Sequence, residues 1–476
     1  MKKKYKHYSI YLNEIESNKK LLSFRCNETN ILIWPILRSN FLNLLQSKLF
    51  YKEWLNYEKN DSIIIKIIRK LVKLFYLFTN INFYKNIIFK IGKNKILFVK
   101  SGYGNIKRKD IIFDRNIDPY LIFAKNNYIT FSRSPYKFKN KIYDKKQYYL
   151  DYNEQVLDFF SKFDRKNIKI SKKISQIVIK DFKKFYKINF TRNEINNLVK
   201  VNLVSLNSIP KKFFYYKNLI EKINPKIAII EGASYSYNAL LNYALHQNNC
   251  KILEPQHGSI SVSYQLSDLL LNNQEYKLYL PDVYLSYGKW WSEQIKLPIE
   301  KIEIGSPNRK KIKSNFKSNK QTNNILILSD GLDSDLIIDF AKRLNLLLKK
   351  KKRIFLRPHP IEKIKWIHEK IKIKNIHIDY EENIFQSFQR KEIIIGEVST
   401  ALFEAIGYIP NIFIWRTPKS IFNIPKHPFT EIKNVEEFAD KINNIPNKKN
   451  KFQINHIYKK NWKKNFQRYL KNSKYN

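Results

Sequence analysis

The chain has 476 residues and carries 89 Lys and Arg against 41 Asp and Glu, a formal net charge of +48. This length exceeds what one hydrophobic core usually supports, so two domains are expected. An apolar content of 43%, with 15% aromatic residues, excludes disorder over most of the chain. Two cysteines, Cys26 and Cys250, exclude a disulfide framework and a cysteine-based metal cluster.

The positive charge is not concentrated in one place. Nearly all of the basic residues are Lys, and they are scattered with Asn and Ile through every segment. Nucleic-acid-binding proteins usually gather basic residues on one face with interleaved aromatic residues. We therefore predict no nucleic-acid partner, and only a general attraction to anions such as nucleotide phosphates and acidic lipid surfaces.

Residues 1–92 are predicted to form an N-terminal helical segment. Within it, 62–78 has a basic amphipathic pattern that fits either the membrane interface or a surface helix packed on its own domain, and we favour the second. The N-terminus lacks the apolar core and cleavage site of a signal peptide. No apolar stretch of about 18 residues is free of charge, so no transmembrane helix is expected. These features predict a cytoplasmic protein, with any membrane contact peripheral at the cytoplasmic face.

Residues 93–307 are predicted to form a Rossmann-like domain. Its clearest part is a βαβ unit over 227–260, with a buried strand at 227–230, a helix of roughly 12 residues and a second strand that ends at Glu254. The order of elements within 105–220 is left open. The other expected elements are strands at 96–99, near 120–131 and at 283–288, and helices near 153–163, 192–220 and 290–295.

A basic linker, 308–324, precedes a second domain, 325–445. Alternating strands and helices predict a second doubly wound α/β domain. Its expected strands are 325–329, 353–357, 375–379, 392–396 and 411–415, and its expected helices are 335–349, 364–371, 384–390 and 400–408. In the last segment, 446–476, a four-residue stripe of apolar side chains predicts a C-terminal helix docked on a domain surface: Tyr458, Trp462, Phe466 and Leu470.

Two polar residues of the first domain follow neighbouring strands. Glu231 comes directly after the strand 227–230, and His257 lies in the loop Gln256-His257-Gly258 after the next strand. Ligands of parallel sheets bind beyond the carboxyl ends of the strands, so Glu231 and His257 are candidate catalytic residues. Each also has a plainer interpretation, as part of a helix N-cap region for Glu231 and as a hydrogen-bonded loop residue for His257.

Three strand ends of the second domain are candidate phosphate sites. Gly331 lies in a turn whose amides could face an anion, although neighbouring Asp residues repel one and a simple helix cap is the stronger interpretation. Arg357-Pro358-His359-Pro360 holds His359 between two prolines. Ser399 and Thr400 begin a helix whose free amides favour anions, with Ser399 as an ordinary N-cap the alternative. Glu404, one turn further on, could reach a ribose hydroxyl or face solvent.

Together these motifs resemble a known family. Glu231-Gly232, Gln256-His257-Gly258, Arg357-Pro358-His359-Pro360 and the stretch 399–405 (STALFEA) are similar to bacterial surface-polysaccharide glycosyltransferases of the GT-B fold. The nearest groups are the capsule transferases related to polysialyltransferases and Kdo transferases, and the CDP-glycerol glycerophosphotransferases. The resemblance covers about residues 225–440. It implies an α/β, GT-B-like fold in which two doubly wound Rossmann-like domains face a cleft.

The resemblance also implies roles for the strand-end residues. The first domain would hold a glycan or lipid-linked glycan acceptor, with Glu231 as general base and His257 facing the cleft. An acidic residue of the polysialyltransferase pattern is missing before Glu231-Gly232, so polysialyl specificity is not implied. The second domain would hold a nucleotide-sugar donor through the candidates Arg357, His359, Ser399, Thr400, Glu404 and Gly331.

The predicted activity is an inverting glycosyl transfer to a capsule, lipopolysaccharide or related surface glycan. No DxD motif stands at a strand end, so we predict a metal-independent reaction with no cofactor beyond the donor substrate. Two alternatives stay open. One is polyol-phosphate transfer of the CDP-glycerol type, and the other is a sugar-nucleotide 2-epimerase on the same fold, for which the N-terminal helices would be surplus.

Overall fold

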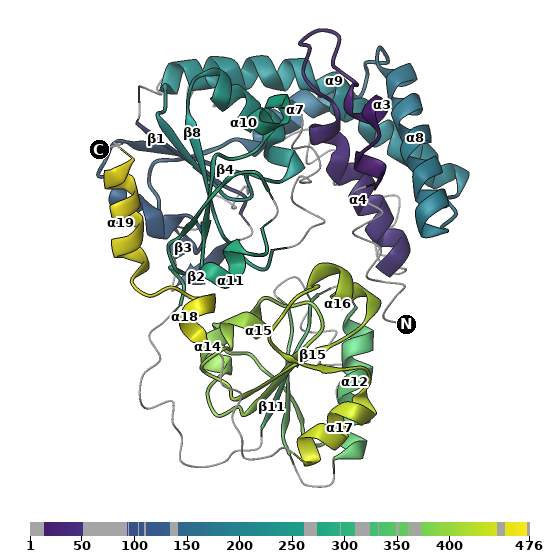
Figure 1. The fold of residues 1–476 in the computed structure, drawn as a ribbon, viewed down its shortest axis with the longest axis vertical. Coiled ribbons are helices and arrows are strands. Elements are labelled where there is room, and N and C mark those ends of the chain that lie inside the picture. The colour runs from purple at the N-terminus through teal and green to yellow at the C-terminus, as the bar shows by residue number, and fades with distance from the viewer. Residues whose placement is uncertain are drawn as a thin grey trace.

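The chain folds into two parallel sheets with helices on both faces of each, and a small third sheet (Figure 1). The computed structural model describes residues 14–50, 93, 95–102, 104–108, 111–133, 141–260, 274–295, 297–309, 324–331, 333–348, 352–359, 362, 373–444 and 453–473.

The first domain contains a seven-stranded parallel sheet. Its strand order is β10-β9-β8-β7-β1-β4-β6, so the chain leaves the middle of the sheet in one direction after β1 and in the other after β7. The boundary between β1 and β7 is therefore the point where the strand order reverses, which is where ligands of such sheets bind. The strands are β1 (Ile96–Lys100), β4 (Tyr128–Ser132), β6 (Gln147–Tyr149), β7 (Ile227–Ile230), β8 (Lys251–Pro255), β9 (Val283–Ser286) and β10 (Glu300–Glu303).

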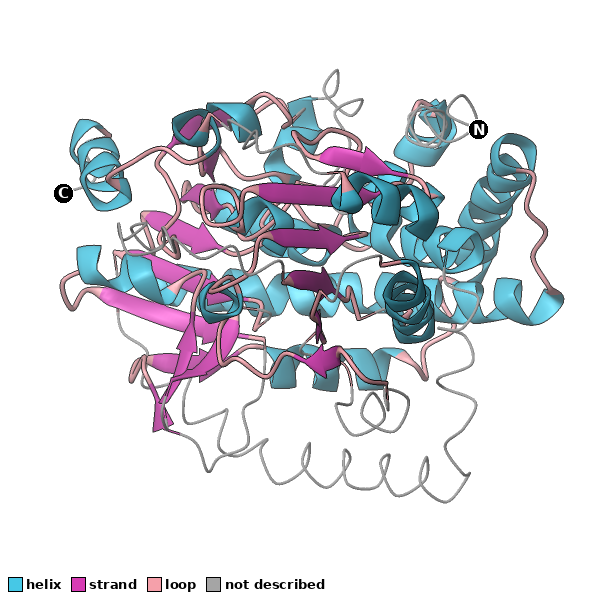
Figure 2. Cartoon of the chain, turned by 90° about the horizontal axis from the view of Figure 1, so that it is seen from below, coloured by secondary structure: helices cyan, strands magenta, loops and turns pink. Residues whose placement is uncertain are grey.

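Alternate side chains of this sheet enter two different cores, as expected for strands buried on both faces. Leu97 and Val99 face the core built with the larger helices, whereas Phe98 faces the core built with η1 (Asp118–Phe123) and α19 (Trp462–Asn472). The strands are seen between helices in Figure 2. The larger helices are α7 (Asp151–Ser161), α8 (Ile168–Tyr186), α9 (Arg192–Ile223) and α10 (Ser236–Gln247).

A small sheet follows β1. It joins β2 (Asn105–Arg108), β3 (Ile111–Asp114) and β5 (Lys141–Ile142), with β2 and β3 forming an antiparallel pair. The 3-10 helix η1 comes next, so the strand predicted near 120–131 is wrong in its first half. Pro119 at the start of η1 explains this, since its fixed φ suits the first turn of a helix.

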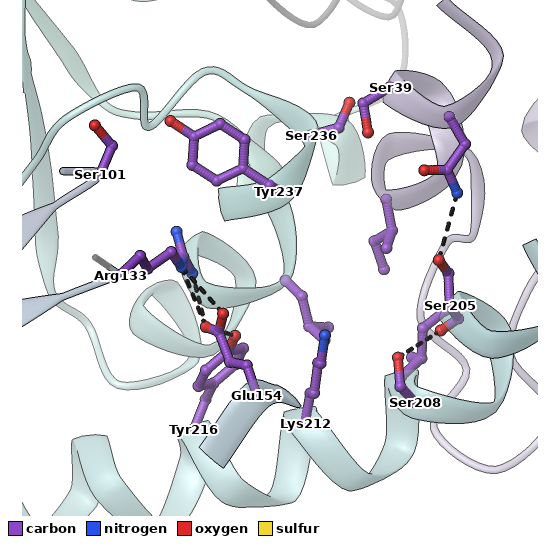
Figure 3. A pocket seen from close by; sticks show the side chains of 14 residues that line it. Ser39, Ser101, Arg133, Glu154, Ser205, Ser208, Lys212, Tyr216, Ser236 and Tyr237 are labelled. Carbon is purple, nitrogen blue, oxygen red and sulfur yellow. Dashed lines mark hydrogen bonds and ion pairs between the residues drawn. The ribbon is translucent and has the colours of Figure 1, made fainter. Parts of the chain in front are cut away.

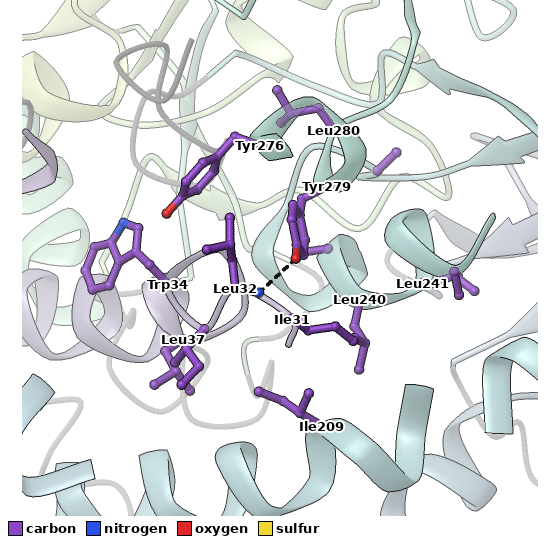
Figure 4. Close-up of a cluster of buried hydrophobic side chains, with 14 of the residues drawn as sticks. Ile31, Leu32, Trp34, Leu37, Ile209, Leu240, Leu241, Tyr276, Tyr279 and Leu280 are labelled. Atoms are coloured by element: carbon purple, nitrogen blue, oxygen red, sulfur yellow. Dashed lines mark hydrogen bonds between the residues drawn. The ribbon is translucent and has the colours of Figure 1, made fainter. Parts of the chain in front are cut away.

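The N-terminal extension packs on the first domain. Its helices α3 (Lys19–Leu22) and α4 (Trp34–Phe50) place Leu32, Trp34 and Leu37 against α10 and the 3-10 helix η3 (Gln274–Tyr279) (Figure 4). The Leu32 amide donates to the Tyr279 hydroxyl at 2.9 Å. Polar anchoring and apolar burial together make the extension part of this domain's core.

The second domain contains a six-stranded parallel sheet of order β13-β12-β11-β14-β15-β16. Numbered from β11, this is the 3-2-1-4-5-6 order of dinucleotide-binding domains, whose ligands lie between the first and fourth strands. The strands are β11 (Ile325–Leu328), β12 (Ile354–Arg357), β13 (Ile376–Ile378), β14 (Ile393–Gly396), β15 (Asn411–Trp415) and β16 (Thr430–Ile432).

Helices cover both faces of the second sheet. One face carries α12 (Ser334–Leu347) and α17 (Val435–Asn443). The other face carries α14 (Ile384–Ser387), α15 (Ala401–Glu404) and α18 (Ile454–Ile457). The short helix α16 (Pro418–Asn423) follows β15.

The chain then returns to the first domain. The single helix predicted over 446–476 is wrong, because α18 and α19 are separated by Asn461 in a left-handed conformation with φ of 60°. The predicted docking is confirmed: Trp462 and Phe466 of α19 make edge contacts with Tyr120 of η1 at 5.6 and 5.0 Å between ring centroids.

The α/β, GT-B-like class with two Rossmann-like domains is confirmed. The predicted helix over 400–408 is too long, because α15 ends at Glu404 and Gly407 has φ of 84°. Helix α8 was not predicted. The segments 62–78 and 364–371 lie outside the described residues, as does most of the linker 308–324. Within the described part of the chain, no helix is long and apolar enough to cross a bilayer.

Candidate active site

Glu231 lies at the reversal point of the first sheet, directly after β7. Its Oε2 accepts a hydrogen bond from the Ser101 amide at 2.8 Å, and its Oε1 accepts one from Asn116 Nδ2 at 2.6 Å. Ser101 follows β1, the neighbouring strand, so the two strand ends jointly hold the carboxylate. Two N–H donors stabilise its negative charge. Glu231 itself is 1% exposed.

A second carboxyl group, Asp114, lies beside Glu231 at the end of β3. Its Oδ1 accepts the amides of Asn116 and Ile117 at 2.8 and 2.9 Å, while its buried Oδ2 has no hydrogen-bond partner. Burial, and then the charge of Glu231, raises the pKa of Asp114 to about 7. Asp114 can therefore hold a proton near neutral pH beside the Glu231 carboxyl group.

Gly104 allows this carboxyl pair to lie against the backbone. A Cβ at position 104 would come within 2.6 Å of Asn116 Nδ2 and 2.7 Å of Asp114 Oδ1. Any side chain here would displace Asp114 itself and Asn116, which holds Glu231.

Asp114→Asn is expected to stabilise the protein at pH 8 but not at pH 4. A carboxyl whose pKa is raised from 3.8 to about 7 on folding contributes stability at low pH, and that contribution is lost as pH rises between those values. The variant avoids this loss, which is on the order of three pKa units at about 1.4 kcal/mol each. Urea denaturation at both pH values measures the change, with exposed Asp440→Asn as the control. A constant difference between Asp114→Asn and wild type across this range would contradict the assignment.

Arg115 joins this site to the second domain. Its Nη1 lies 3.7 Å from Glu404 Oε1 of α15, and its side chain is 34% exposed. Burial alone would lower the pKa of Arg115, but the charges of Glu404, Glu231 and Asp114 raise it. Arg115 is therefore a permanent cation between the carboxyl pair and the second domain.

His257 occupies the loop after β8, facing the same region. Its Nε2 lies 3.3 Å from the Tyr235 hydroxyl, and its buried Nδ1 has no hydrogen-bond partner. Burial, helped by the charge of Arg115, lowers the pKa of His257 to about 4. A neutral imidazole with an unused nitrogen can donate or accept one hydrogen bond, but it carries no charge at pH 7.

The next loop residue brings the two domains together. A Cβ at Gly258 would lie 3.1 Å from Thr400 Cγ2, so the loop of His257 meets the Ser399-Thr400 turn of the second domain. Nearby, Trp291 and Phe403 pack with their ring centroids 4.6 Å apart. The loop of His257 and the turn of Thr400 thus lie at one interface between the domains.

The switch point of the second sheet lies between β11 and β14. Ser399 Oγ accepts the Ala401 amide at 3.3 Å, which supports its simpler role as a local cap. The Gly331 amide donates to Ser329 Oγ at 3.3 Å, and Asp333 caps α12 by accepting the Leu336 amide. Phosphate binding by Ser399, Thr400 and Gly331 remains a prediction.

Arg357 and His359 have different surroundings at the end of β12. Arg357 Nη1 lies 3.2 Å from Asp379 Oδ1 and donates to Ser387, contacts that favour a role in holding the strand end. His359 is exposed at the rim, and its amide donates to Glu362. Donor binding by Arg357 remains a prediction, and of the two side chains His359 is the better placed.

The acidic residues at this edge are neutralised. Lys419, 7% exposed, lies 2.7 Å from Asp330 Oδ2 and 2.6 Å from Glu397 Oε2. Burial alone would lower the pKa of Lys419, but Glu397 and Asp330 raise it. The repulsion that Asp330 would exert on a phosphate is therefore reduced.

The comparisons with known proteins give structural likeness alone. No protein-family model matches the chain, and no curated protein matches its sequence. A UDP-GlcNAc 2-epimerase from Methanocaldococcus jannaschii, solved with UDP-GlcNAc and UDP, is 12% identical with a TM-score of 0.43, and the match covers 80% of this chain and 99% of that one. The calicheamicin glycosyltransferase CalG4 is 7% identical with a TM-score of 0.42, covering 74% and 89%. The spinosyn rhamnosyltransferase SpnG, solved with thymidine diphosphate, is 9% identical with a TM-score of 0.42, covering 73% and 90%. Structural similarity at this level does not support a conclusion about activity.

Sequence reasoning missed Asp114, Arg115 and Asn116. A signal was present, because three polar residues follow the apolar run Ile111-Ile112-Phe113. The sequence did not indicate that the hairpin of β2 and β3 folds back over the end of β7. Among the described residues, no group of three or more His, Cys, Asp and Glu side chains is placed to hold a metal ion, and metal independence remains a prediction.

Proposed function

We propose that this chain is a glycosyltransferase that moves a sugar from a nucleotide-activated donor to a bacterial surface glycan, with inversion and without a metal ion. The observation that carries the proposal is the paired carboxyl groups, Glu231 and Asp114, at the switch point of the first sheet. They lie beside a cation, Arg115, that contacts the second domain.

The chemistry is a single displacement. The acceptor hydroxyl oxygen attacks the anomeric carbon of the donor while the bond from that carbon to the phosphate oxygen breaks. Glu231 takes the hydroxyl proton, and the nucleotide leaves with the bonding electron pair. A carboxyl group at the switch point, beside a second carboxyl that can carry a proton near neutral pH, suits this base role.

The leaving phosphate needs positive charge or hydrogen-bond donors as the bond breaks. Arg115 supplies the charge from the first domain, and the rim residue His359, with the turn at Ser399, supplies donors from the second. Domain contact around this point also excludes water from the donor.

Nucleotide binding is the first test, by thermal shift with CMP, CDP, UDP, GDP and dTDP, each with and without magnesium. One of them is expected to raise the melting temperature without metal, because a ligand that binds only the folded state adds about 2.7 kcal/mol at 100 times its Kd. His359→Ala is expected to weaken that binding at least tenfold.

His377→Ala is the matched control, since this exposed histidine of the same domain lies on β13. Equal nucleotide affinity in wild type and His359→Ala would remove His359 from the donor site. Conversion of a nucleotide sugar to its 2-epimer without acceptor would contradict glycosyl transfer and favour the epimerase alternative.

A further inference from the structure

A polar cavity of about 420 Å³ is lined by residues of the first domain and of the N-terminal extension (Figure 3). Its walls come from the N-terminal helix α4, from α7 and α9, from the ends of β1 and β4, and from the first turn of α10. The lining residues are Ile36, Ser39, Asn40, Ser101, Arg133, Glu154, Ser205, Ser208, Ile209, Lys212, Tyr216, Ser236, Tyr237 and Leu240.

One wall of this cavity is shared with the candidate base. Ser101, which lines the cavity, donates its amide to Glu231 Oε2 at 2.8 Å. Tyr237 places its hydroxyl against Gly232, where any Cβ would collide with it. Tyr237 also contacts Tyr235, whose hydroxyl lies 3.3 Å from His257 Nε2. A molecule in the cavity would therefore be separated from Glu231 by Ser101, and from His257 by the two tyrosines.

The charges that line the cavity are already paired. Arg133 Nη2 lies 2.9 Å from Glu154 Oε1, and Tyr216 donates to the same carboxylate. Lys212 Nζ lies 2.8 Å from Asp158 Oδ1. Burial alone would raise the pKa of Glu154, but Arg133 lowers it, so the pair stays ionised and mutually neutralised. This lining gives little attraction for an anion and little for a cation.

Hydroxyl groups make up most of the remaining polar surface. Five serines and two tyrosines line the cavity, and each hydroxyl can both donate and accept a hydrogen bond. Ser236 is 2% exposed, and its Oγ has no hydrogen-bond partner among the described residues. A buried hydroxyl without a partner is unfavourable, and a ligand with hydroxyl groups would supply the missing hydrogen bond.

We propose that this cavity binds an uncharged sugar unit of the acceptor glycan. It is within the range of about 300–1,000 Å³ typical of small-molecule sites. Mixed donor and acceptor groups suit the hydroxyls of a sugar, and the shared Ser101 wall directs one of them toward Glu231. This orientation toward Glu231 rests on the proposed transferase function, whereas sugar binding itself does not.

The N-terminal extension forms one wall of this cavity. Ile36, Ser39 and Asn40 of α4 form part of the lining, and Asn40 Nδ2 donates to Asn202 Oδ1 of α9 at 3.0 Å. Without α4 the cavity would lose this wall. The extension is therefore part of the substrate site.

The test uses a larger side chain at one lining position to narrow the cavity. Ser205→Leu replaces the hydroxyl oxygen by three carbon atoms, a net gain of two heavy atoms that the open space of the cavity should accommodate. Saturation-transfer NMR titrations would use the methyl glycosides of glucose, galactose, N-acetylglucosamine and N-acetylgalactosamine. At least one should bind the wild type, with affinity at least tenfold weaker in Ser205→Leu and unchanged in Asn197→Leu, a control on an exposed position of the same helix.

Three results would overturn the inference: no binding of any neutral glycoside to the wild type, equal binding to Ser205→Leu, or binding of methyl glucuronide or inorganic phosphate alone. Ser236→Ala, which changes one hydroxyl with little loss of volume, should also weaken binding. Nucleotide thermal shifts on the same variants separate the two proposals. Neutral sugar binding that Ser205→Leu weakens, without any nucleotide binding, would support a sugar-binding cavity and contradict the transferase proposal.

Discussion

Glu231→Gln is expected to lower kcat for glycosyl transfer by about 100- to 10,000-fold, the range for a lost general base. Glutamine keeps the shape of the side chain. Its oxygen can accept the Ser101 amide, and its NH2 can donate to Asn116 Oδ1, which has no partner in wild type, after the Asn116 amide turns over. The protein should therefore fold while lacking the group that takes the proton. Rates with donor and acceptor, measured beside nucleotide affinity, should show loss of turnover with binding kept.

Glu254→Gln is the matched control for this experiment. Glu254 lies one residue before the end of the neighbouring strand β8, is 0% exposed, and accepts a hydrogen bond from the Ser234 amide at 2.8 Å. Burial raises its pKa to about 8, so it is largely protonated at pH 7 and glutamine closely mimics it. Activity within a few-fold of wild type is expected. Comparable loss in both variants would mean that packing, and not proton transfer, explains the effect at Glu231.

The sequence predicted most of the parallel strands because apolar runs are local, but it missed the three-residue strands β6 and β16. Glu231 and His257 follow neighbouring strands because β7 and β8 pair, as the βαβ pattern predicts. The β2–β3 hairpin was missed because Asn105–Arg108 carries little apolar alternation. Its pairing with β3 is fixed by contacts, not by pattern.

Sites made by helix packing were beyond sequence reasoning. Ser39, Ser101, Ser205 and Ser236 lie in four distant parts of the chain, and no motif connects them. Only the packing of α4 and α10 on α9 brings them to one cavity. Likewise, the pairing of Arg115 with Glu404 depends on how the domains meet, which one sequence does not specify.

Arg38→Met is expected to lower the free energy of unfolding of the first domain by about 3–5 kcal/mol, the cost of leaving one member of a buried ion pair alone. Arg38 and Glu16 are 1% and 0% exposed, and Arg38 Nε donates to Glu16 Oε1. In the variant, the Glu16 carboxylate would keep the Trp34 indole N–H, at 3.1 Å, but lose its countercharge. Chemical denaturation followed by tryptophan fluorescence measures the change.

Two companion variants define the origin of that loss. Glu16→Leu combined with Arg38→Met replaces the pair by apolar side chains, and should recover most of the stability because no charge stays buried. Arg343→Met, which breaks an exposed pair with Glu436, should cost about 0–1 kcal/mol. If the double variant and Arg38→Met have the same free energy of unfolding, the hydrogen-bonded ion pair itself stabilises the packing of the N-terminal extension. Because α4 also lines the cavity proposed to bind a sugar, that outcome would connect this ion pair to the proposed acceptor site as well as to stability.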